Sequence, residues 1–79
     1  ESYYAQEKEL IIRLAVCQMP EQRRRIFDMS RYMGMDNQTI ATTLNLSKKT
    51  VENHLTLALK TLRSILAVWA SLFIAGGGF

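Results

Sequence analysis

Residues that break helices are almost absent from this chain. Its 79 residues include one proline, Pro20, and four glycines, three of which stand together at positions 76–78. Proline and glycine interrupt helices more strongly than any other residues. Apolar residues recur at helical spacing on both sides of Pro20, and no segment shows a competing strand pattern. The sequence therefore predicts an all-α fold, a small helical bundle.

The segment before Gly34 predicts two helices. The first lies within residues 5–18. Pro20 and Glu21 begin the second, because proline suits the first helical turn and an acidic residue is favourable there. Gly34 is expected to end this helix in a left-handed conformation. The expected buried face of the first helix consists of Leu10, Ile11, Leu14 and Cys17.

Residues 36–65 predict a helix-turn-helix. Asp36 caps a short helix that ends near Leu44, Asn45 tolerates a left-handed cap, and Ser47 caps a second helix. Two helices joined by such a short turn, the second with a polar outer face, form this motif. The apolar residues of the second helix recur at steps of four and three. Its expected buried stripe is Val51, Leu55, Ala58, Leu62 and Ile65.

Charge and composition limit the classes of function. Residues 20–63 carry eight basic and four acidic side chains, whereas residues 64–79 carry none, and this distribution favours a polyanionic partner. One cysteine and one histidine exclude an internal disulfide and a His/Cys zinc site. No set of residues suits catalysis, so we predict no enzyme, metal, cofactor or small-molecule substrate. Cys17 is expected to be a small buried residue in a protein of the reducing cytoplasm.

The outer face of the second helix in this motif carries side chains that can bind DNA. A major groove admits one helix, where asparagine can bind adenine, glutamate can bind cytosine, and lysine can bind guanine or phosphate. A solvated polar face is the alternative, and His54 can instead have a structural role. The outer-face candidates are Lys48, Lys49, Thr50, Glu52, Asn53, His54, Thr56 and Lys60.

Several motifs resemble region 4 of bacterial sigma factors. Residues 19–31, beginning Met-Pro-Glu and ending Ser-Arg, are similar to the pattern LPExxRxxFxxSR. Residues 34–41 match GxxxxEIA, with Thr39 where the acidic residue usually stands. Residues 47–63 match SxxTVxxHxxxAxxxLR, although Leu57 replaces a residue that is often basic. The resemblance covers about residues 18–66 and is best for the extracytoplasmic-function (ECF) subgroup.

The resemblance implies a function in transcription initiation. The helix that starts at Lys48 would bind the promoter −35 element, and the domain would dock on the β flap of RNA polymerase. Ser47 and Thr39 join the DNA-binding candidates, while Arg24 and Arg31 would be backbone contacts or structural ion pairs. The residues expected to bind the partner protein are Ile26, Met29, Tyr32 and Met33.

The resemblance also implies a division of the chain. Residues 1–18 would be a linker helix from a missing region 2, without which the chain alone is not expected to initiate transcription. Residues 19–66 would form the helix-turn-helix domain, with a three-helix core of the winged-helix type that lacks a wing. Residues 67–79 would form an apolar tail that packs on the first helix, mediates self-association or partner contact, or associates with a membrane.

Two alternative functions remain open at this point. A LuxR-like response regulator shares the SxKTVxxH pattern, and it would bind paired half-sites as a dimer. A protein-interaction module bound by an anti-sigma factor is the other alternative, and the apolar tail and the methionines near residue 33 motivate it.

Overall fold

The computed structural model describes the backbone of residues 3–77 and the side chains of residues 6–71. Its elements are four helices: α1 (Tyr3–Cys17), α2 (Glu21–Arg31), α3 (Asn37–Leu44) and α4 (Lys48–Gly77). The part of the chain described here contains no strand, as an all-α fold requires. Helix-turn-helix geometry is present where the sequence predicts it, with α3 and α4 as its two helices.

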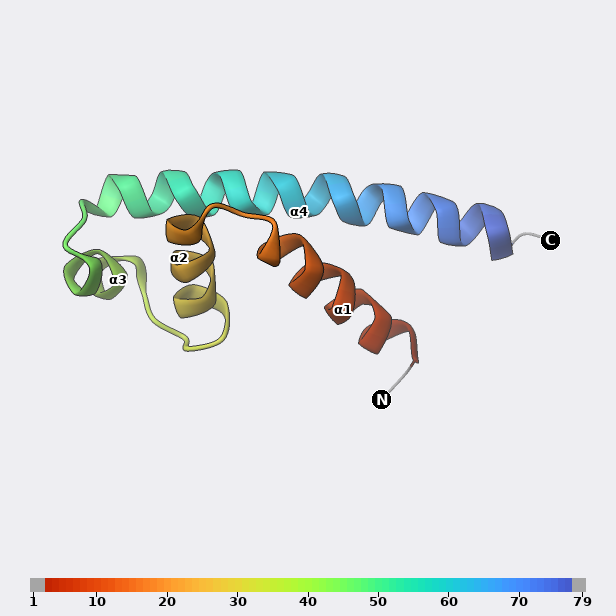
Figure 1. Cartoon of the computed structure of the whole chain (residues 1–79), viewed down its shortest axis with the longest axis horizontal. Helices are drawn as coiled ribbons and strands as arrows, with labels where there is room; N and C mark the ends of the chain where they lie inside the picture. The colour runs from red at the N-terminus through yellow and green to blue at the C-terminus, as the bar shows by residue number, and fades with distance from the viewer. Residues whose placement is uncertain (1–2, 78–79) are drawn as a thin grey trace.

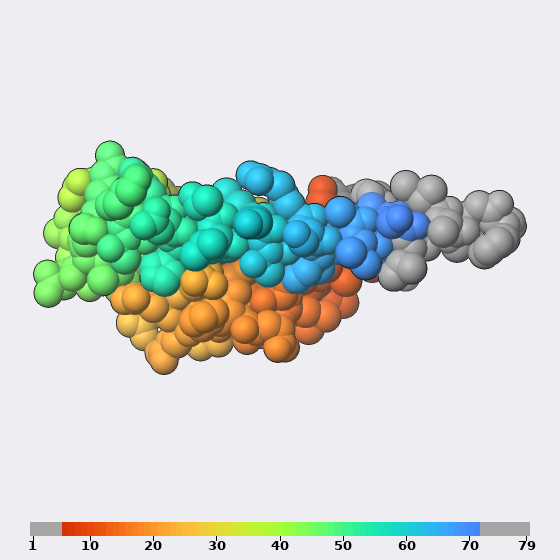
Figure 2. Space-filling model, turned by 90° about the horizontal axis from the view of Figure 1, so that it is seen from above, coloured from red at the N-terminus to blue at the C-terminus, as the bar shows by residue number. Residues whose placement is uncertain are grey.

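Helix α4 is the axis of the molecule. It is 30 residues long, and the other three helices pack along one side of it, α3 and α2 near its start and α1 farther along. Figure 1 shows that α1 diverges from α4 towards the N-terminus, so the two helices form an open V. The molecule is elongated, with extents of 51 × 24 × 16 Å, and α4 forms a continuous ridge along it (Figure 2).

Local side-chain chemistry sets the helix boundaries in the helix-turn-helix. The Asp36 carboxylate accepts a hydrogen bond from the Thr39 backbone N–H at 2.7 Å, which caps α3. Asn45 has the left-handed φ of 58° that ends α3. Gly34 is also left-handed, with a φ of 66°. The second helix ends at Arg31, three residues before Gly34. The caps of α3 and of the start of α4 confirm the boundaries expected from the sequence, whereas the C-cap of α2 is Tyr32 rather than Gly34.

One core cluster holds the helix-turn-helix together. It consists of side chains from α2, α3 and α4 that are at most 1% exposed, and partly buried residues such as Leu46 in the turn pack around it. Burying an aliphatic side chain of this size contributes about 1.5–3 kcal/mol. The cluster therefore fixes the orientation of α4 relative to α3. Its members are Ile26, Ile40, Ala41 and Val51.

A second cluster attaches α1 to the rest of the molecule. Phe27, Ala58 and Leu62 supply the surface on α2 and α4, and Leu55 packs against both clusters. Helix α1 and the residues after it contribute Ile12, Ala15, Val16 and Met19. The segment predicted as a linker is thus part of the core of this domain.

The predicted buried face of α1 is wrong. Leu10 is 55% exposed, Leu14 is 56% exposed and Cys17 is also exposed. The apolar residues of α1 form two stripes at helical spacing, and periodicity alone does not select between them. The observed rotation is the one that lets Glu9 and Arg13 reach Tyr32 at the end of α2.

The apolar tail continues α4 without a break. Ile65 and Leu66 pack against the second cluster, and the backbone of the tail extends the last helix to Gly77. Packing of residues 67–79 on α1 stays a prediction. The boundary predicted after residue 66 falls inside the helix. Residues 78–79, and the side chains from residue 72 onward, lie outside the described part.

No helix among the described residues is both long and apolar enough to cross a membrane.

Candidate nucleic-acid interface

The first half of α4 exposes one continuous polar face. Lys49, Asn53, Thr56 and Lys60 are all exposed, and their spacing of four, three and four residues places them on one side of the helix. The buried stripe that begins at Val51 lies on the opposite side. The core therefore determines where this polar face, here called the outer face of α4, points.

The start of α4 holds two of the predicted DNA-binding residues, Ser47 and Thr50, in one hydrogen-bonded cap. Ser47 Oγ accepts a hydrogen bond from the Thr50 backbone N–H at 3.0 Å and donates one to Thr50 Oγ1 at 2.8 Å. The Ser47 proton is thus used within the cap, which leaves the Thr50 hydroxyl hydrogen for an outside acceptor. Lys48 is exposed at the same end, where the helix dipole favours an anion. The arrangement suits a phosphate group.

Thr39 lies near this end of α4, in the first turn of α3. The backbone N–H of Thr39 and then its side chain hydrogen-bond to Asp36, and with the nearby charge of Lys48 they hold the pKa of that carboxyl below its usual range. Asp36 is therefore an ionised neighbour of Lys48. Glu52 is half-buried on the flank of the outer face and is the acidic member of the candidate set.

His54 lies at the margin between the outer face and the core. Its Nδ1 accepts a hydrogen bond from Arg23 Nε on α2 at 3.4 Å, in a partly buried position. The contact ties α4 to α2 and leaves Nε2 as the ring nitrogen that can bind elsewhere. A structural role for His54, one of the two alternatives from the sequence, has a partner in the structure.

The arginine triplet of α2 is divided among different neighbours. Arg23 contacts His54, and Arg25 forms an ion pair with Glu21 at 2.9 Å. Arg24 is half-buried and lines a small hollow beside Cys17. The three side chains therefore do not form one basic patch. This agrees with their consecutive positions, because neighbouring residues in a helix point in different directions.

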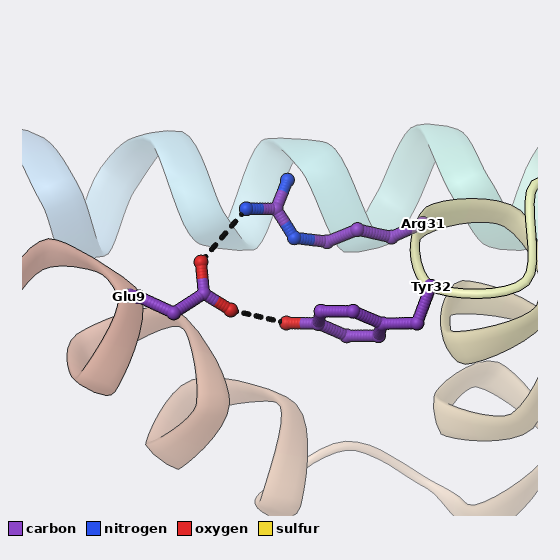
Figure 3. A network of polar contacts seen from close by, with 3 residues as sticks. All are labelled: Glu9, Arg31 and Tyr32. Carbon is purple, nitrogen blue, oxygen red and sulfur yellow. Dashed lines mark hydrogen bonds and ion pairs between the residues drawn. The ribbon is translucent and has the colours of Figure 1, made fainter. Parts of the chain in front are cut away.

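Arg31 is engaged within the molecule. Its guanidinium forms an ion pair with Glu9 on α1 at 2.9 Å, and Tyr32 Oη donates to the other Glu9 oxygen at 2.6 Å (Figure 3). The Tyr32 hydrogen bond, followed by that of Arg31, holds the pKa of Glu9 below its ordinary value. Glu9 in turn raises the pKa of Arg31. The structure thus supports the ion-pair alternative for Arg31 rather than a DNA contact.

Aromatic contacts complete this network. The Arg13 and Arg31 guanidinium carbons lie 5.2 Å and 5.5 Å from the centroid of the Tyr32 ring. Phe27 meets the same ring edge to face, with centroids 6.5 Å apart. Tyr32 therefore joins α1, α2 and the core. The sequence gives no indication of this, because the partners lie about twenty residues apart along the chain.

A groove with a basic rim lies between α1, α2 and α4. Its apolar floor includes Phe27, Leu59 and Leu62, and it is here called the basic groove. The basic residues that line it are Lys8, Arg31 and Arg63. Sequence patterns do not indicate this groove, because its lining depends on how α1 packs against α4.

The predicted partner-binding residues have different positions. Ile26 is completely buried in the first core cluster and offers no surface to a partner, so that prediction is wrong. Met29 is half-buried against the same cluster. Tyr32 is 44% exposed and Met33 is 66% exposed. Tyr32 and Met33 are thus the members of the set that a partner can reach directly.

The chain is similar to a known protein family. Residues 9–62, more than half of the chain, match the family model described as Sigma-70, region 4. The match begins within α1, which agrees with the packing of α1 in the core. No curated protein matches the chain.

Proposed function

The chain belongs to the sigma-70 region 4 family, and from that membership we propose which of its surfaces bind the promoter and the polymerase. Region 4 is the −35 promoter-binding part of sigma factors and directs transcription initiation. It is a DNA-binding family rather than a catalytic one. Membership favours the sigma interpretation over the response-regulator alternative. The assignment to the ECF subgroup remains a prediction.

We propose that the outer face of α4 enters the major groove of the −35 element. The observation that carries this proposal is the exposed row of Lys49, Asn53, Thr56 and Lys60 on a helix whose opposite side is buried. In helix-turn-helix proteins, residues near the start of the second helix reach the base edges. Asn53 is the base-binding candidate, because an amide can form two hydrogen bonds with adenine.

In this proposal the residues at the N-terminal end of α4 supply the phosphate contacts. Lys48, Thr50 and Ser47 lie at the positive end of the α4 dipole, where a DNA phosphate is stabilised. Thr39, in the first turn of α3, is linked to this end through Asp36, which it hydrogen-bonds and which feels the charge of Lys48. Arg24, half-buried and away from this end, is the weakest candidate in the predicted set.

Selection of duplexes from a randomised pool tests this function. The chain would be used fused to, or reconstituted with, its polymerase. One short asymmetric motif at the −35 position is the expected result. Paired palindromic half-sites would support the response-regulator alternative, and no enrichment would contradict promoter binding.

Substitution of Asn53 tests the base contact within the selected site. We expect Asn53→Ala to weaken binding by about 1–3 kcal/mol at one base pair and to relax the preference there. Thr61→Ala, an exposed α4 residue off the outer face, is the control. Equal losses on selected and random duplexes would show that Asn53 does not bind a base.

RNA polymerase is the second partner of a region 4 domain. We propose that the β flap docks on the basic groove and on the neighbouring exposed Tyr32 and Met33. An apolar floor with a basic rim supports this, because it suits an acidic, amphipathic segment. An anti-sigma factor that blocks the same groove is a further proposal. We also propose that the protein acts in the cytoplasm, because promoter DNA and RNA polymerase are its proposed partners.

Two leucines of α4 provide a matched test of the polymerase surface. Leu59 and Leu57 are each 45% exposed, but only Leu59 lines the basic groove. Leu59→Gln should weaken binding to the polymerase, whereas Leu57→Gln should leave it unchanged. The DNA affinity of the isolated chain serves as the common control. Equal polymerase binding by both variants would exclude the basic groove as the docking surface.

A further inference from the structure

A second groove lies between α1 and α4, beside the basic groove. It is lined by Ile11, Ser64, Ile65, Val68 and Trp69, and no charged residue takes part. A helix turns about 100° per residue, so the α4 residues that line this groove point about 140° around the helix axis from those that line the basic groove. This second surface, the neutral groove, is therefore separate from the proposed polymerase surface.

Exposed apolar side chains extend the neutral groove on both helices. Val68 is 60% exposed on α4. Leu14 is 56% exposed and lies about one turn after Ile11 on the outer side of α1, with Leu10 one turn before Leu14. A groove lined by apolar side chains, with further exposed apolar side chains on the same helices, is typical of an interaction site.

The amount of exposed surface is consistent with a missing partner. The chain exposes 5565 Å², whereas a compact protein of its mass exposes about 4,900 Å². The excess of about 700 Å² belongs to the elongated chain as a whole, and exposed apolar side chains such as Val68 and Leu14 are part of that surface. The radius of gyration of 14.7 Å likewise exceeds the roughly 11.6 Å expected for a compact domain of this length.

Charge indicates what the partner is. Residues 64–79 contain no charged side chain, so the end of α4 can approach an identical segment without repulsion. Helices α1 and α2 and the first part of α4 carry charged residues on their exposed faces, and the exposed residues of α3 are polar. The last part of α4 is therefore the helical surface of this chain that best matches the neutral groove.

We propose that two copies of the chain form a dimer in which the end of α4 of each copy occupies the neutral groove of the other. The contact is isologous, with a two-fold axis, and the α4 helices run antiparallel in a four-helix arrangement with the two α1 helices. In this arrangement the two basic helix-turn-helix ends lie at opposite ends of the dimer. Each molecule is 51 Å long, which is well beyond the Debye length of about 8–10 Å, so the repulsion between the two ends is largely screened.

Sedimentation equilibrium of the 79-residue chain over a range of concentrations tests the dimer. The expected result is a reversible equilibrium between 9.1 kDa and twice that mass, with no larger species, since an isologous interface closes at two copies. A mass that stays at one chain up to the solubility limit would overturn the proposal. Continued growth beyond two copies would also overturn it.

Two lysine substitutions locate the interface. Val68→Lys places a charge in the neutral groove and should raise the dissociation constant of the dimer by about tenfold or more. Gln22→Lys is the control for charge, because Gln22 is exposed, gains the same charge and lines neither groove. Circular dichroism should show unchanged helix content in both. Equal dissociation constants for the two variants would overturn the assigned interface.

A lipid surface is the competing occupant, and a separate measurement excludes it. Vesicles of phosphatidylcholine with phosphatidylglycerol should not bind the wild-type chain more tightly than Val68→Lys. Binding of the wild-type chain to these vesicles as a monomer, lost in Val68→Lys, would overturn the dimer. The inference is independent of promoter binding, because both lysine variants should bind the selected −35 duplex with equal affinity.

Discussion

At the scale of single residues, the carboxylate of Glu9 connects α1 to the end of α2. It accepts a hydrogen bond from Tyr32 and pairs with Arg31, an interaction that a DNA contact of Arg31 would have to replace. Charge-assisted bonds of this kind are shorter and stronger than neutral ones. Because Glu9 and Arg31 are each about 40% exposed, the ion pair contributes no more than about 1 kcal/mol. Its main effect is to set the rotation of α1.

The lowered pKa of Glu9 predicts a pH-dependent contribution to stability. The folded pKa lies below the ordinary 4.5, so the contribution is complete above that value and is lost as the pH falls through the folded pKa. Glu9→Gln should therefore lower the melting temperature at neutral pH, and the difference from wild type should shrink below pH 4.5. Thermal unfolding followed by circular dichroism measures this. A difference that is constant with pH would contradict an ionised Glu9 in the network.

Lys49 provides a second prediction at this scale. If Lys49 contacts a phosphate, Lys49→Ala should reduce the slope of log affinity against log salt by about one. Lys8→Ala removes the same charge from α1, away from the outer face of α4, and should leave the slope unchanged. Fluorescence anisotropy with a labelled duplex at several salt concentrations gives both slopes. Equal slopes for Lys49→Ala and wild type would remove Lys49 from the interface.

At the scale of helices, local sequence predicts where each helix ends but not how each is rotated. Asp36, Asn45 and Ser47 lie where capping rules place them, because a cap depends only on its near neighbours. The rotation of α1 depends on Tyr32 and on the packing of α4, which lie far along the chain. This is why the motif was predictable while the buried face of α1 and the two grooves beside it were not.

The cap of α4 can be tested directly. Ser47→Ala removes the bond to the Thr50 N–H and should lower the free energy of unfolding by about 1 kcal/mol. It should also weaken DNA binding, because Thr50 loses the partner that orients its hydroxyl. Thr61→Ala, at an exposed position away from the ends of α4, should change the free energy of unfolding very little. Chemical denaturation and duplex binding are the measurements, and an unchanged stability would show that Ser47 does not cap the helix.

At the scale of the whole molecule, one side chain packs against both core clusters. Leu55 contacts the helix-turn-helix cluster on one side and the α1 cluster on the other. Without it the two clusters share little apolar contact. The molecule is therefore expected to unfold in a single transition that depends on Leu55.

Truncation of Leu55 tests this connection. Leu55→Ala should lower the free energy of unfolding by about 2 kcal/mol, near the lower end for leucine truncations because the site is partly buried. It should also broaden the thermal transition. Leu57→Ala, two residues away and 45% exposed, should change stability by less than about 0.5 kcal/mol. Equal effects of the two substitutions would contradict the bridging role.

Because α4 is one continuous helix, it fixes the angle around its axis between side chains at its two ends. A helix turns about 100° per residue, so Asn53 and Val68 project about 60° apart regardless of the loops. Insertion of one residue between Lys60 and Ser64 would swing the neutral groove by about 100° around the axis. Insertion of seven would shift it by only about 20°. The outer face of α4 and its apolar end thus belong to one continuous helix, and the angle between them is set by the number of residues that separate them.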